Sequence, residues 1–131
     1  METLSAILER REKRRQALEA SLLHLVEQLK ALGALKVVLF GSLARGDVHR
    51  GSDLDIIAVM PSSRSSHDWM NTVYSEVDRG IACDILAYSE TDFREMLPTS
   101  RFLRHALREG KVLYEAKRLA RSAPLASASQ G

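Results

Sequence analysis

The hydrophobic positions of this chain change period several times along the sequence. Leucines recur at helical spacing from about Thr3 to Leu32, which predicts one long helix. This apolar stripe thins between Arg10 and Arg15, so we expect the first turns to project beyond the core. Continuous short apolar runs, which are typical of buried strands, follow at 37–40, 55–60 and 81–88.

Helical patterns separate and follow these strands. One is expected at about 67–78 with Trp69, Val73 and Val77 inside, one from Ser89 to about 96, and one at about 100–109. A short fourth strand at 112–114 is expected after them. This alternation predicts an α/β (α+β) fold with a small, mixed three- to four-stranded sheet flanked by helices. We expect a single domain at 1–116, with the N-terminal helix at 1–32 and a core at 36–88, and a flexible tail at 117–131.

Charge and composition narrow the class of protein only slightly. The 131 residues carry a formal net charge of +2, which is too small to indicate nucleic acid as a partner. Arginines and lysines gather at 10–15 and 101–111, where solvated helix faces are the ordinary interpretation. Cys83 is the single cysteine, so no internal disulfide can form. No stretch is apolar enough to cross a membrane, and the first residues do not resemble a secretory signal, so we expect a cytoplasmic protein.

The segment 40–57 carries the chemistry of this sequence. Gly41 and Ser42 stand where the first apolar run ends, and a helix that started there would offer backbone N–H groups to a phosphate. Asp53 and Asp55 open the next apolar run one residue apart. Alternate strand residues share a face, roughly 6.5–7 Å apart along the backbone, so these two carboxylates should project together. Such a pair needs a cation or water to offset its charge, and hard oxygen ligands favour Mg²⁺ or Mn²⁺.

Asp84 is a third carboxylate, within the apolar run at 81–88. A charge inside such a strand needs a partner. If this strand lies beside the one that begins at Asp55, Asp84 joins the same site as a metal ligand or base. The alternative is that Asp84 pairs with an arginine or caps a bend. Likewise, Ser42 alone would be an ordinary helix cap.

These motifs resemble the minimal nucleotidyltransferases of the DNA polymerase β superfamily, which include antitoxins. Their pattern is matched by GSLARG at 41–46 and GSDLD at 51–55, with the third acidic residue at Asp84. The ending REGKVLY at 108–114 is also similar to that of the family. The resemblance covers roughly 36–114 and implies a polymerase β-like nucleotidyltransferase fold. The long N-terminal helix and the polar tail depart from a minimal member.

The resemblance implies transfer of AMP from ATP to a hydroxyl group. Gly41 and Ser42 would hold the phosphates, and Arg45 would either touch them or brace the loop. Asp53, Asp55 and Asp84 would hold two Mg²⁺ ions, with Mn²⁺ as an alternative, and Asp84 would help to deprotonate the acceptor.

No second substrate-binding domain is recognisable, so a partner protein is the expected acceptor. Minimal members often pair with a HEPN-domain toxin, commonly encoded nearby, and modify a tyrosine on it. A second copy of this chain is a further candidate partner. The alternative function is a binding antitoxin that uses a catalytically inert or dispensable nucleotidyltransferase fold. A metal-dependent glycosyltransferase and a haloacid-dehalogenase phosphatase also use paired aspartates. The first assigns no role to Gly41 and Ser42, and the second places its pair after a strand rather than before one.

Overall fold

The structure, a computed structural model, describes residues 3–41, 54–78 and 83–117. It is a mixed α+β fold with a four-stranded sheet. In chain order the elements are α1 (Leu4–Ala31), β1 (Lys36–Phe40), β2 (Leu54–Met60), α2 (Ser66–Glu76), β3 (Cys83–Ser89), α3 (Glu90–Met96), α4 (Arg101–Glu109) and β4 (Lys111–Glu115). The expected fold class is confirmed.

The sheet has the strand order β3-β2-β1-β4. β1 pairs with β2 and with β4 in antiparallel register, whereas β2 and β3 run parallel. Parallel strands require a long crossover, and α2 lies within the connection between β2 and β3. β3 and β4 therefore form the two edges of the sheet.

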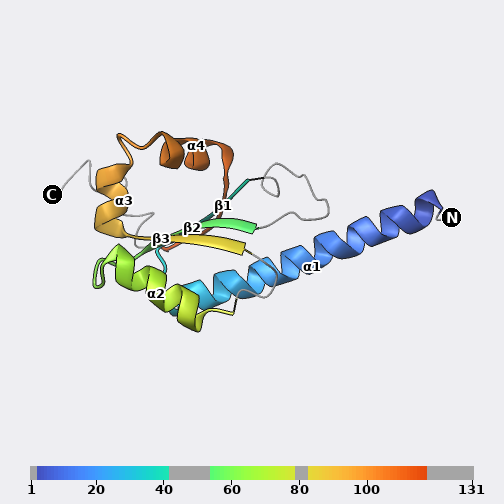
Figure 1. Cartoon of the computed structure of the whole chain (residues 1–131), viewed down its shortest axis with the longest axis horizontal. Coiled ribbons are helices and arrows are strands. Elements are labelled where there is room, and N and C mark those ends of the chain that lie inside the picture. Colours follow the sequence, from blue (N-terminus) through green and yellow to red (C-terminus); the bar gives the residue numbers. More distant parts are fainter. Residues whose placement is uncertain (1–2, 42–53, 79–82, 118–131) are drawn as a thin grey trace.

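Helices cover both faces of this sheet (Figure 1). The larger core cluster joins α1 and α2 to one face, through side chains such as Leu25, Trp69 and Ile56. The smaller cluster joins α3 and α4 to the opposite face, through Phe93 and Leu103. Because strand side chains alternate between faces, successive residues of β1 and β2 enter different clusters.

The first half of α1 extends past the sheet, as its sequence predicts (Figure 1). Thr3 caps the helix by accepting a hydrogen bond from the Ala6 amide at 3.1 Å. None of residues 4–17 is buried, and the buried series begins at Leu18. We call residues 4–17 the N-terminal arm. The C-terminal half is tied to the end of α2, where the Gln28 side chain exchanges two 2.7 Å hydrogen bonds with the backbone of Asp78.

The element boundaries shift slightly from those expected. The helix expected at 67–78 spans Ser66–Glu76, and Val77 is extended but still buried. Trp69 is a core residue, as its position on that helix predicts, and its indole N–H donates to the Pro61 carbonyl at 2.7 Å. The fourth strand exists and is longer than expected. A helix start after Ser42 and almost all of the tail lie outside the described residues. The single domain at 1–116 stays a prediction.

No helix in the described ranges is long and apolar enough to cross a membrane.

Gly110, which links α4 to β4, is packed so tightly against α4 and β1 that a larger residue should not fit. A Cβ atom there would lie 2.7 Å from the Leu39 carbonyl oxygen and 2.9 Å from Cγ1 of Val38. We expect Gly110→Ala to lower the free energy of unfolding by about 1–3 kcal/mol, measured by urea denaturation. The neighbouring Glu109→Ala, on an exposed side chain, should change it by less than about 0.5 kcal/mol. Equal effects of the two substitutions would contradict this packing.

Candidate functional site

Two predicted site carboxylates lie side by side on the parallel strands. Asp55 of β2 is the register partner of Asp84 of β3. Neighbouring strands are about 4.8 Å apart, so the two side chains start from adjacent backbone positions. Asp55 alternates with Ile57 and Val59, and Asp84 alternates with Leu86, so both belong to the face that α3 and α4 cover. The structure therefore brings together two residues that are 29 positions apart in sequence.

Asp84 differs from expectation in its surroundings. The prediction that Asp84 lies within a strand is confirmed, but the apolar neighbours suggested that its charge would need a protein or metal partner. Asp84 is the second residue of β3 and is exposed, so water can solvate its carboxylate. Asp55 is half-buried. The site thus lies at an end of the sheet where one carboxylate is partly enclosed and its neighbour is open to solvent.

Gly41, the residue that follows β1, brings its backbone against Asp55. Its φ is +91°, in the left-handed region that favours glycine. A Cβ atom on Gly41 would collide with Oδ2 of Asp55 and would lie 3.3 Å from its carboxyl carbon. The preceding residue, Phe40, is the antiparallel register partner of Asp55. Both the backbone angle and the space at position 41 therefore require glycine.

The remaining predicted site residues, Ser42, Arg45 and Asp53, lie outside the described residues. Their roles stay predictions. In the sequence, Ser42 directly follows Gly41, and Asp53 is two positions before Asp55.

The two site carboxylates within the described residues suit a hard divalent cation. Asp55 and Asp84 offer four carboxylate oxygens, the ligand type that Mg²⁺ and Mn²⁺ prefer. Within the described ranges, no group of three His, Cys, Asp or Glu side chains is arranged to hold a metal ion. A complete site therefore needs a further ligand, for which Asp53 is the candidate.

An aromatic pair that sequence reasoning missed borders these carboxylates. The rings of Phe40 and Phe102 meet edge to face, with centroids 5.5 Å apart and planes at 80°. Phe102 belongs to α4 and keeps 45% of its surface exposed. Because Phe40 is paired with Asp55, these rings form an apolar border beside the acidic position. The position of Phe40 next to Gly41 was the one sequence signal for this aromatic pair, and no sequence pattern linked Phe40 to Phe102.

The arginines of α4 form a separate basic surface. Arg101, Arg104 and Arg108 are exposed, as the solvated-face interpretation predicts, and with His105 they line an open hollow. Phe102 and the arginines thus make α4 an element with an aromatic contact to the sheet and a cationic outer surface.

Comparison with known proteins agrees with this arrangement. The family model of the nucleotidyltransferase domain matches residues 22–114. A protein of Methanocaldococcus jannaschii named "putative protein adenylyltransferase" is 35% identical over 81 residues, which cover 60% of this chain and 77% of that protein. The crystal structure of a "putative nucleotidyltransferase" from Sulfolobus solfataricus has a similar fold, with a TM-score of 0.55. It is 20% identical, and the match covers 89% of this chain and 93% of the other.

The family match runs from the second half of α1 to β4 and so includes the described site residues Gly41, Asp55 and Asp84. It excludes the N-terminal arm and the segment after β4. The chain therefore belongs to the nucleotidyltransferase domain family.

Proposed function

We propose that this nucleotidyltransferase transfers AMP from ATP to a hydroxyl group in a Mg²⁺-dependent reaction. The observation that carries the proposal is the pairing of Asp55 with Asp84, with Gly41 packed against the Asp55 carboxylate. The relative from Methanocaldococcus jannaschii, which is named "putative protein adenylyltransferase", favours AMP as the transferred group and a protein as the acceptor.

Each predicted site residue has its own role in the proposed reaction. Gly41 and Ser42 would hold the β- and γ-phosphates through backbone N–H groups and a hydroxyl, and Arg45 would contact the phosphates or brace the loop. Asp53, Asp55 and Asp84 would hold Mg²⁺, which would neutralise charge on the phosphates when bound. The half-buried position of Asp55 suits a ligand that must stay fixed, whereas the exposed Asp84 can meet an incoming acceptor.

In the proposed step, the acceptor oxygen attacks the α-phosphorus of ATP and the bond between this phosphorus and the α–β bridging oxygen breaks. The hydroxyl proton passes to Asp84 or to a water beside it, and pyrophosphate leaves. The products are an AMP ester of the acceptor and pyrophosphate. Positioning and charge neutralisation supply most of the rate enhancement in such in-line displacements.

The proposed acceptor is a tyrosine of a HEPN-domain protein encoded nearby, so that modification neutralises a toxin in the cytoplasm. The proposed unit is the single domain at 1–116, whose described part has one sheet and no second domain over the carboxylates. The open setting of Asp84 supports an acceptor supplied by a separate protein. The alternative, a binding antitoxin that needs no catalysis, shares the same fold and differs in whether the carboxylates matter.

Removing either paired carboxylate should abolish transfer while preserving the fold. We expect Asp55→Asn and Asp84→Asn each to lower incorporation of α-labelled AMP into the purified HEPN-domain protein by at least about 10²-fold. Asp68→Asn, the same change on an exposed carboxylate in the first turn of α2, should leave the rate within about twofold. Circular dichroism checks the fold. Transfer that survives Asp55→Asn would overturn the proposed site.

The role of Gly41 can be separated from its backbone strain by comparison with Gly33. Both glycines have a left-handed φ, +91° and +105°, so alanine should strain both by about 1–3 kcal/mol. Only at Gly41 would the new Cβ displace Asp55, since at Gly33 its nearest neighbour would be Cγ of Pro61 at 3.4 Å. We therefore expect Gly41→Ala to reduce AMP transfer at least about tenfold more than Gly33→Ala, assayed well below both melting temperatures. Equal rates for the two variants would show that Gly41 has no special role.

Catalytic and contact-only neutralisation predict different results in growing cells. If modification is required, Asp53→Asn should fail to restore growth of cells that express the toxic partner, although the variant still binds it. Co-purification measures the binding and growth rate measures the rescue. Equal rescue by wild type and Asp53→Asn would favour the binding antitoxin instead.

A further inference from the structure

The N-terminal arm continues the seam by which α1 packs on the sheet. Positions 18, 22, 25 and 29 of α1 follow alternating steps of four and three residues, and all four are buried leucines. The same steps extended backwards reach Leu4, Leu8, Arg11 and Arg15. Leu4 is 71% exposed and Leu8 52% exposed. The arm therefore carries two exposed leucines on the face that the rest of the helix buries.

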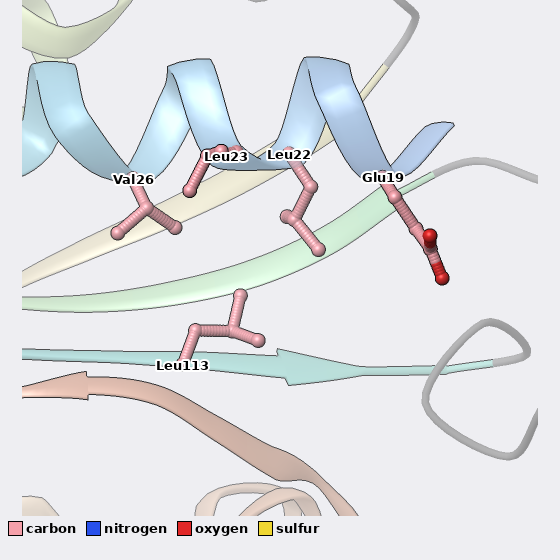
Figure 2. Close-up of a pocket in the computed structure, with 5 residues that line it drawn as sticks. All are labelled: Glu19, Leu22, Leu23, Val26 and Leu113. Carbon is pink, nitrogen blue, oxygen red and sulfur yellow. The ribbon is translucent and has the colours of Figure 1, made fainter. Parts of the chain in front are cut away.

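A groove lies beside this seam at the other end of the helix. Leu22, Leu23 and Val26 of α1 and Leu113 of β4 line a hollow of about 180 Å³, and Glu19 stands at its end toward the arm (Figure 2). Leu23 is 65% exposed. β4, which lines the groove with α1, is an edge strand of the sheet. An occupant of this groove needs apolar side chains followed by a cation opposite Glu19.

We propose that two copies of this chain pair through α1 in antiparallel orientation, with the leucines of each N-terminal arm in the groove of the other. In this register, Leu8 of one copy lies over Leu22 and Val26 of the other, and Arg11 lies near Glu19. The two-fold axis passes close to Arg15. In this one register, each arm fills the groove of the other copy, as a closed, self-complementary dimer requires.

Charge within the arm favours this occupant. Arg15 is held in its own chain by Glu12 at 2.6 Å and Glu19 at 2.7 Å, so the two Arg15 side chains would approach the axis already neutralised. The hydrogen bond from Arg15 lowers the pKa of the Glu12 carboxyl, which keeps that partner ionised. The seam positions 11 and 15 of each copy are arginines, and Glu12 and Glu19 lie beside the seam. The other basic residues of this run, Arg10, Lys13 and Arg14, fall outside the steps of the seam.

Sedimentation velocity of the full chain tests the dimer directly. We expect a species of twice the 14.6 kDa chain mass. Leu8→Glu should raise the dimer dissociation constant by about tenfold or more, because it places an unpaired charge in an apolar groove. Leu8 makes no buried contact within one copy, so the melting temperature at low concentration should not change. Met96→Glu, an exposed apolar side chain on α3, is the matched control and should leave the dissociation constant unchanged. A wild-type chain that stays monomeric, or a Leu8→Glu variant that dimerises normally, would overturn the proposal.

A double-mutant cycle then tests the register. Arg11→Ala and Glu19→Ala should each weaken the dimer, and the double variant should lose less binding free energy than the sum of the two single losses, because each single substitution already breaks the same pair. If the two losses simply add, Arg11 and Glu19 are not opposed and the antiparallel register is wrong. This measurement does not depend on AMP transfer, so its outcome is independent of the proposed reaction.

Discussion

Parallel pairing of β2 with β3 sets Asp55 beside Asp84, and α2 holds that register. The hydroxyl of Tyr74 on α2 donates to the carbonyl of Ile85 at 3.2 Å and accepts from its amide at 3.3 Å. Ile85 directly follows Asp84, so this contact fixes β3 next to the acidic position. A slip of one residue would turn Asp84 to the opposite face of the sheet, away from Asp55. The candidate site thus depends on a crossover helix that contributes neither of the two carboxylates.

Close packing at the end of the sheet that holds these carboxylates restricts which residues fit there. Gly41 lets the backbone directly after β1 approach Asp55, and Gly110 lets the end of α4 pack against β1. Phe102 of α4 then meets Phe40 beside the carboxylates. The two glycines therefore allow close packing at the end of the sheet that holds the two carboxylates. Only Gly41 has a left-handed φ, whereas Gly110 is required by space alone.

Two exposed features of this protein suit contacts with other molecules: the carboxylate of Asp84 and the N-terminal arm. The exposed Asp84 suits an acceptor that arrives from outside, and the described part of the chain has no second domain to supply one. The N-terminal arm has leucines that no described element covers, and the same chain has a groove of matching chemistry. The nucleotidyltransferase family match begins at residue 22 within α1, after the arm.

Local pattern determined much of this protein. Helical periodicity predicted α1 and its projecting arm, because an apolar stripe that gives way to arginines cannot be buried. The same periodicity predicted α3 and α4 to within a few residues of their ends. The shared strand face of Asp53 and Asp55 stays a prediction, because Asp53 lies outside the described residues. The likeness of these motifs to the nucleotidyltransferases predicted the family. Such features depend on neighbours in sequence, so they can be seen without a structure.

Tertiary structure alone decided the rest. Which strand lies beside β2, how exposed Asp84 is, and which helix brings an aromatic ring to Phe40 all depend on contacts between residues far apart in the chain. Asp84 shows the difference most clearly, because its apolar neighbours in sequence suggested burial while its place near the start of an edge strand exposes it. The groove beside Leu113 likewise exists only because β4 packs next to α1. Burial and proximity are properties of the packed chain, and a sequence pattern reports them only where packing follows local periodicity.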